Sequence, residues 1–150
     1  MFKALLATHL VLVVFAIGPL VHAATTAARG VRRGDGTATT SAARTLRIYS
    51  YASLLVVIIG FALMSTKAPW NPKQHVAEFK DTWIWVSLLL WVVAIAIVLA
   101  VIVPTLERAT KLIGEQESVV ALTGRVAAAG GVVGLLFLAV VVLMTYQPGG

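Results

Sequence analysis

The sequence predicts an all-α protein, a four-helix transmembrane bundle with short loops. Four stretches are long, apolar and nearly free of charge: residues 4–28, 48–65, 83–104 and 122–146. At about 1.5 Å per residue, a helix over each of them crosses most or all of a hydrocarbon core roughly 30 Å thick. Apolar residues make up 59% of the chain and charged residues 12%, against about 25% charged in soluble domains. Residues 1–150 therefore form a single membrane domain.

The distribution of basic residues predicts the orientation of the bundle. Eight lie in the first and third loops or at their edges: Arg29, Arg32, Arg33, Arg44, Arg47, Arg108, Lys111 and Arg125. Four lie at the N-terminus and in the second loop: Lys3, Lys67, Lys73 and Lys80. Because basic loops are retained in the cytoplasm, we expect a multi-pass protein of the plasma (cytoplasmic) membrane with both termini outside.

The first span also has features of a cleaved signal peptide. Lys3 supplies a basic start, and residues 21–23 (Val-His-Ala) resemble a cleavage site. The apolar run of residues 4–21 is longer than the usual core of a signal peptide, which is about 7–15 residues. Cleavage would also place the arginine-rich first loop outside, against the charge bias. We therefore expect the first span to remain as an anchor.

The first loop, residues 29–47, is rich in arginine. Gly34-Asp35-Gly36 favours a flexible tip, and the segment from Thr40 onward favours a helix that continues into the second span. Its arginines can meet anionic headgroups such as those of cardiolipin, or an acidic partner surface. The simpler alternative is that they only fix the topology. The residues expected to contact lipid or a partner are Arg29, Arg32, Arg33, Arg44, Arg47 and, in the middle of the third span and facing lipid, Trp91.

The second and third loops have different compositions. Pro69 and Pro72 exclude a regular helix at the start of the second loop, whereas residues 75–81 favour a short interfacial helix. The third helix is expected to extend beyond the membrane, with a kink at Pro104 and an end near Gly114.

The fourth span carries a patch of small residues that predicts close helix packing. Its members are Ala127, Gly130, Gly131 and Gly134, spaced so that two small-xxx-small patterns overlap. In lipid, helices associate through close van der Waals contact, which small residues permit. The contacting helix is either another span of this chain or a helix of a partner.

Few residues in the spans favour catalysis or cofactor binding. The chain has no cysteine, and His9 and His22 lie 13 residues apart, roughly 20 Å along one helix. Two histidines of the spans therefore cannot ligate one haem, and we expect no cofactor, no metal and no enzymatic activity of the chain itself. The net charge of +6 is explained by membrane orientation, without a nucleic-acid partner. The alternative is a small transporter or a copper-handling protein that uses His9, with Met64 or Met144 as soft ligands.

Five features together carry a resemblance to known membrane proteins: His9, the segments 15–19 (FAIGP) and 60–63 (GFAL), Trp83, and the segment 122–125 (LTGR). The chain resembles four-helix integral membrane proteins of unknown function that are similar to the copper-resistance D membrane domain. The histidine of that pattern matches only at His9. The companion ligands are missing, and no metal site is carried over.

The Ala/Val-rich composition, the four spans and the lack of cofactor ligands are also similar to the small accessory membrane proteins of actinobacterial respiratory supercomplexes, of the supercomplex-association factor type. That resemblance implies a non-catalytic subunit that stabilises a cytochrome bcc–aa3 oxidase assembly through contacts with other membrane subunits.

Overall fold

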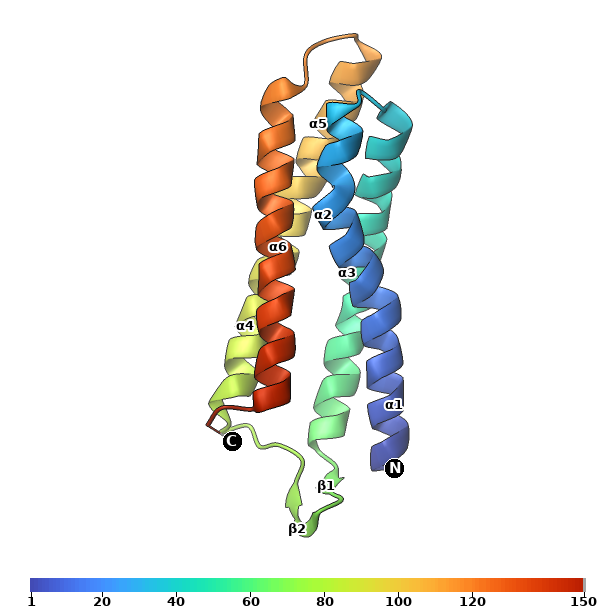
Figure 1. The fold of residues 1–150 in the computed structure, drawn as a ribbon. Helices are drawn as coiled ribbons and strands as arrows, with labels where there is room; N and C mark the ends of the chain where they lie inside the picture. The colour runs from blue at the N-terminus through green and yellow to red at the C-terminus, as the bar shows by residue number, and fades with distance from the viewer. Residues whose placement is uncertain (150) are drawn as a thin grey trace.

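The computed structural model describes residues 1–149 and confirms the all-α, four-helix architecture (Figure 1). The four long helices cover Phe2–Arg32, Gly36–Met64, Thr82–Gly114 and Val120–Tyr146, and each is long and apolar enough to cross a membrane. Their segments are α1 (Phe2–Leu12), η1 (Val13–Ile17), α2 (Gly18–Arg32), α3 (Gly36–Met64), α4 (Thr82–Ile97), η2 (Val98–Ile102), α5 (Val103–Gly114) and α6 (Val120–Tyr146). The chain is a multi-pass membrane protein.

The connection between α2 and α3 is a tight turn at residues 33–35, where Gly34-Asp35-Gly36 predicted the tip, and the helix expected from Thr40 onward starts four residues earlier, at Gly36. Gly34 adopts φ +63°, and the Asp35 N–H donates to the Gly30 carbonyl at 3.0 Å, which closes the end of α2. Asp35 then caps α3, because its Oδ1 accepts from the Ala38 N–H at 3.0 Å. Helix α3 therefore starts at Gly36, twelve residues before the apolar stretch.

The second loop contains a small antiparallel hairpin of β1 (Lys67–Ala68) and β2 (Asn71–His75). His75 belongs to β2, and residues 76–81 are irregular, so the expected short helix over residues 75–81 was wrong. The His75 Nδ1 lies 2.9 Å from the Ser65 carbonyl oxygen, which ties the hairpin to the end of α3. Lys80 pairs with Glu78 at 2.8 Å, and the hydrogen bond and charge of that carboxylate raise the pKa of the Lys80 ammonium.

The third loop, residues 115–119, follows α5 as expected. Helix α5 ends at Gly114, but the left-handed residue that closes it is Gln116 at φ +58°. The Glu117 N–H donates to the Leu112 carbonyl at 2.8 Å, the same closing bond that follows α2.

The first and third long helices share an irregularity at a proline. The π-helical turns η1 and η2 directly precede Gly18-Pro19 and Val103-Pro104. Proline has no N–H to donate to the carbonyl four residues earlier, and its ring presses on that carbonyl. A π turn widens the helix at this point and makes room for the proline ring. Such turns are usually accompanied by a bend in the helix axis.

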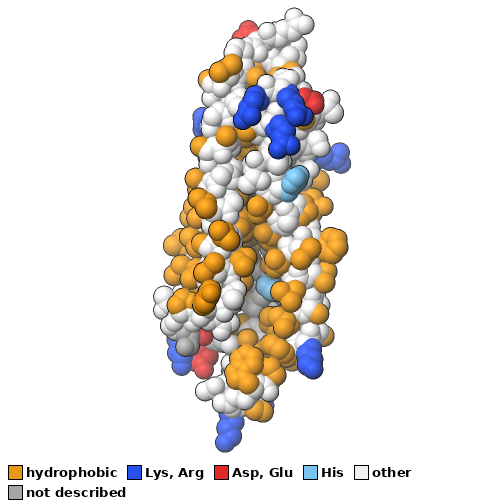
Figure 2. All heavy atoms as spheres, in the orientation of Figure 1, with side chains coloured by type: hydrophobic (Ala, Val, Ile, Leu, Met, Phe, Trp, Pro, Cys, Tyr) orange, Lys and Arg blue, Asp and Glu red, His pale blue; other side chains and the backbone are white. Residues whose placement is uncertain are grey.

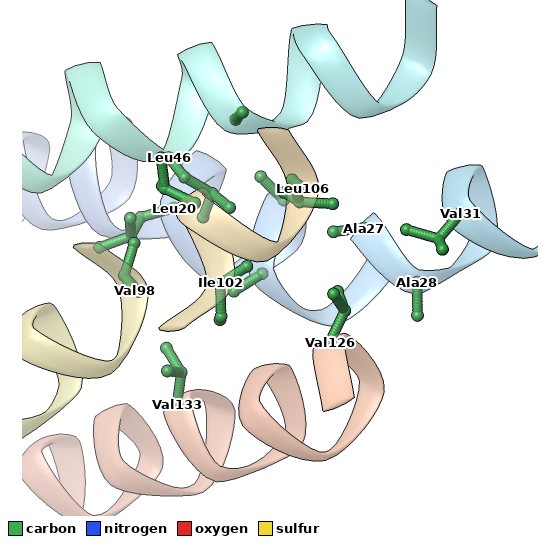
Figure 3. Close-up of a cluster of buried hydrophobic side chains, with 14 of the residues drawn as sticks. Leu20, Ala27, Ala28, Val31, Leu46, Val98, Ile102, Leu106, Val126 and Val133 are labelled. Atoms are coloured by element: carbon green, nitrogen blue, oxygen red, sulfur yellow. The ribbon is translucent and has the colours of Figure 1, made fainter. Parts of the chain in front are cut away.

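The core lies between α2, α3, η2–α5 and α6 (Figure 3). Helix α2 packs against α3 and α6, and α5 packs against α3. The largest side chains that are fully buried there are Leu20, Val31, Leu46, Val98, Ile102, Val103, Leu106, Val126 and Val133. Past the π turns the bundle divides, since α1 packs on α3 and α4 packs on α6 (Figure 1).

The two ends of the bundle differ. We call the end formed by residues 33–35 and 115–119 the basic end, and the opposite end, with both chain termini and residues 65–81, the terminal end (Figure 1). Lys and Arg side chains gather near both ends, and hydrophobic side chains cover the middle (Figure 2). This is the surface expected of a bundle whose middle part contacts the lipid acyl chains.

Candidate functional site

The five arginines of the first connection are all exposed around the basic end. Arg47 Nη2 on α3 pairs with Glu107 Oε1 on α5 at 2.5 Å, and both side chains are about half exposed. Such an exposed ion pair contributes about 0–1 kcal/mol to the free energy of unfolding. It also occupies the Arg47 guanidinium, so among the arginines expected to contact lipid, Arg47 is the one that is already partnered within residues 1–149.

A groove between α3 and α5 holds two of these arginines. Thr40 and Arg44 line its whole length, and Arg47 and Ile48 line the part nearer the middle of the bundle. The groove is shallow and open to its surroundings along both parts. The hydroxyls of Thr39 and Thr110 lie 2.6 Å apart and join α3 to α5 beside it. The guanidinium can bind the phosphate group of a lipid, and the apolar residues next to it can contact the acyl chain of the same lipid.

The indole N–H of Trp91 points into the bundle. Trp91 lies on α4, is half-buried against the core, and donates from Nε1 to Ser53 Oγ on α3 at 3.2 Å. An indole N–H in the middle of a bundle needs an acceptor, and here the acceptor comes from a neighbouring helix rather than from a partner. Trp91 is partly exposed as well, so its predicted contact with lipid or a partner stays a prediction.

The small residues of α6 divide between two faces. Gly130 is buried against α2, and a Cβ at this position would overlap the Ala24 carbonyl oxygen and lie 2.9 Å from its carbonyl carbon. A Cβ at Gly134 would lie 3.3 Å from Thr25 Cγ2, also on α2. Ala127 and Gly131 are exposed, and nothing lies within 4 Å of a Cβ built on Gly131. One small-residue pattern therefore packs internally, and the other faces outward.

His9 is the buried histidine of the first span. It is 8% exposed, and its Nδ1 has no hydrogen-bonding partner in residues 1–149. It packs on Gly60 of α3, where a Cβ would lie 3.2 Å from the His9 Cε1. Of the two methionines considered with it, Met64 packs with Ala77 and Ile84, and Met144 is exposed on α6.

Sequence reasoning missed the polar residues inside the bundle. Ser50, Ser53 and Ser87 are buried at 1%, 0% and 3% exposure, and the Oγ atoms of Ser50 and Ser87 have no partner within residues 1–149. The available signal was the rarity of such residues: a serine inside an apolar stretch is costly unless it is hydrogen-bonded or faces a cavity.

No protein-family model, curated protein or solved structure matches this chain.

Proposed function

We propose that this chain is a non-catalytic structural subunit that packs against a larger membrane complex and stabilises it. The observation that supports this proposal most directly is the outward face of α6. Helix α2 already covers Gly130 and Gly134, whereas Ala127 and Gly131 remain exposed with open space in front of them. In lipid, small residues allow a second helix to approach closely.

The outward face continues along α6 beyond its small residues. Leu135, Leu138 and Val142 are exposed and follow Gly131 at helical spacing. Gly131 has no side chain and open space in front of it, so a neighbouring transmembrane helix can approach α6 closely at this point and contact the larger side chains beyond it. The proposal that this neighbour belongs to a cytochrome bcc–aa3 respiratory assembly rests on the resemblance given above.

The groove between α3 and α5 supports a second element of this proposal, binding of an anionic lipid such as cardiolipin. Arg44 offers a guanidinium that no acidic group occupies within residues 1–149. Ile48, one turn along α3, and the exposed side chains of Tyr51 and Leu55 continue as an apolar strip for an acyl chain.

Replacement of Arg44 by Gln is expected to weaken cardiolipin binding about fivefold, since a basic residue at the headgroup level is worth about 1 kcal/mol. Glu107→Gln is expected to strengthen it, because this change releases Arg47 from its ion pair. Native mass spectrometry of the purified chain with added cardiolipin measures both. Arg125→Gln, an exposed change on α6 away from the groove, is the matched control. Equal loss in Arg44→Gln and Arg125→Gln would show that only net charge matters.

The proposed function is tested by extraction of the tagged chain from its own membrane in a mild detergent, followed by mass spectrometry and a visible absorption spectrum. Co-purification of haem-containing cytochrome subunits at a fixed ratio is the expected result. A colourless protein that elutes alone would contradict the proposal.

His9 supports the alternative, a small transporter or copper-handling protein, because it is buried with an unpartnered nitrogen. The two functions differ in their response to His9→Ala. A structural subunit keeps its partners after this substitution, whereas a metal-handling protein loses metal tolerance in the cell.

A further inference from the structure

Large aromatic side chains are exposed at the terminal end of the bundle. The second loop, residues 65–81, carries Trp70 at 69% exposure and Phe79 at 60% exposure. Trp85, in the first turn of α4, is 52% exposed. Hydrophobic side chains continue from the middle of the bundle onto this end, beside lysines (Figure 2). Because exposed aromatic rings are costly in water, they indicate a surface that an apolar medium covers.

The depth of this surface in the bilayer follows from the lengths of the helices. Arg47 and Glu107 are the charged residues of α3 and α5 nearest to the middle of the bundle, so their ion pair marks one edge of the hydrocarbon core. Met64 lies 17 positions from Arg47, about 25 Å at 1.5 Å per residue. Ile84 lies 23 positions from Glu107, about 35 Å. Since Met64 and Ile84 pack together, their contact lies near the other edge of a core roughly 30 Å thick.

Trp70 lies just outside that second edge. His9 of α1 packs on Gly60 of α3, and the two helices run antiparallel. From this level Phe2 is seven residues, about 10 Å, toward the terminal end, whereas Met64 is four residues, about 6 Å. The Trp70 ring meets the Phe2 ring edge-on, so it lies about 4 Å beyond Met64. The headgroup layer extends about 5–7 Å beyond the hydrocarbon on each side.

The segment that follows the hairpin, residues 76–81, folds back toward the spans. The Phe79 ring stacks on Phe61, which lies about one turn nearer to the middle of the bundle than Met64. The Trp85 Nε1 donates to the Phe79 carbonyl oxygen at 2.7 Å, so these two exposed aromatic residues lie together. Both contacts hold the segment at the level where the spans end.

Exposed lysines lie near the aromatic side chains. Lys3 of α1 and Lys67 and Lys73 of the hairpin are exposed, and no acidic side chain within residues 1–149 pairs with them. A lysine side chain can contact acyl chains through its apolar stem while its ammonium group reaches a lipid phosphate. The charge of this surface therefore suits phospholipid headgroups.

We propose that the second loop lies in the headgroup layer of the bilayer at the terminal end, with its aromatic side chains at the acyl-chain boundary and its lysines at lipid phosphates. Aromatic side chains favour this layer, because the ring is apolar and an indole N–H can reach polar headgroups. The loop is thereby a membrane-binding element and not a connection in water. The inference does not depend on the proposed function, because it concerns only the contact of this chain with lipid.

Site-directed spin labelling tests this inference, since the chain has no cysteine of its own. A nitroxide is attached to Phe79→Cys in the full chain in phospholipid vesicles. Its collision rates with oxygen, which concentrates in lipid, and with a water-soluble nickel chelate are measured by electron paramagnetic resonance. Glu117→Cys, exposed in the third loop, sets the values in water. Leu138→Cys, on α6 at a side chain that is 59% exposed, sets the values in lipid.

The collision rate with nickel is expected to be at least about fivefold lower at Phe79→Cys than at Glu117→Cys, because a polar solute loses about 1 kcal/mol when it leaves water for a partly polar medium. The oxygen rate is expected to lie between those of the two reference sites. Equal nickel rates at Phe79→Cys and Glu117→Cys would mean that the loop projects into water and that the inference is wrong. Low rates with both reagents would mean that protein covers the site, which also contradicts it.

The native Trp70 gives a second measurement that leaves the hairpin unchanged. In a chain with Trp83→Phe, Trp85→Phe and Trp91→Phe, Trp70 is the sole tryptophan. Lipids brominated near the headgroup end of the acyl chain are expected to quench its fluorescence more than lipids brominated near the chain terminus. Acrylamide in water is expected to quench it more weakly than in the same chain unfolded in denaturant. Strong quenching by acrylamide without quenching by brominated lipid would overturn the inference.

Discussion

Gly130→Ala is expected to destabilise the bundle by about 3 kcal/mol, the upper part of the usual range for overpacking. The added methyl group would overlap the Ala24 carbonyl oxygen, and its distance to the carbonyl carbon would be only 2.9 Å. The obstacle is backbone inside α2, which cannot rotate away as a side chain can. Helices α2 and α6 must therefore separate, and the core between them loses contact around Val126 and Val133. Thermal unfolding in detergent measures the effect as a fall in Tm of roughly 6–12 °C.

Gly131→Ala is the matched control, one residue along the same helix. Nothing lies within 4 Å of the added methyl group, so only helix propensity changes. Alanine in the middle of a helix stabilises the folded state by roughly 0.5–1 kcal/mol relative to glycine. The two substitutions are chemically identical and are expected to shift Tm in opposite directions. Equal melting of the two variants would mean that α6 does not cross α2 at Gly130.

The four spans could be predicted because hydropathy and length alone determine which segments cross a bilayer. The end of the third long helix at Gly114 was also predicted, from its glycine, but the start of the second long helix could not be predicted from hydropathy. Helix α3 begins at Gly36 because Asp35 caps it, well before the apolar stretch, and its first turns are polar. Hydropathy reports where a helix meets lipid, whereas caps and turns determine where it starts. The arginine-rich connection is therefore mostly helix.

The hairpin at the terminal end depends on contacts between distant residues. The Phe2 ring meets Trp70 edge-on at 6.4 Å between ring centroids, and Phe61 stacks on Phe79 at 6.1 Å. The first contact holds the turn of the hairpin against the first long helix, and the second holds the irregular segment 76–81 against the second long helix. The prolines correctly excluded a helix over residues 67–73, but the antiparallel pairing of β1 with β2 follows from contacts that no local pattern reveals.

The sequence predicts that the small residues of α6 pack against a helix, but not which of them face α2. The small residues of α6 belong to two overlapping patterns, and the sequence alone gives no preference for which of them faces inward. Ridge packing against α2 decides it in favour of Gly130 and Gly134. The position of Trp91 in the middle of the third span predicts contact with lipid, but not the hydrogen bond that its indole N–H makes. Its acceptor, Ser53, is 38 positions away and becomes visible only when α3 and α4 are placed together.

Gly131→Leu is expected to reduce co-purification of the partner by about tenfold or more, the size of effect seen when a residue at the centre of an interface is disturbed. The leucine would fill the open space in front of Gly131, through which a partner helix is proposed to approach α6 closely. The folded chain itself is expected to tolerate the change, since the space in front of Gly131 is open. The measurement is the ratio of partner to tagged chain after mild-detergent extraction, with Tm of the isolated chain recorded in parallel.

Ala96→Leu supplies the control, because Ala96 is also a small exposed residue, but on α4. It adds similar bulk to the lipid-facing surface away from α6. Loss of the partner in Gly131→Leu with retention in Ala96→Leu locates the interface on α6. If both variants retain the partner, the outward face of α6 is not the surface that contacts it. In that case the groove between α3 and α5 would become the next surface to test, since its Arg44 carries charge that α6 lacks near Gly131.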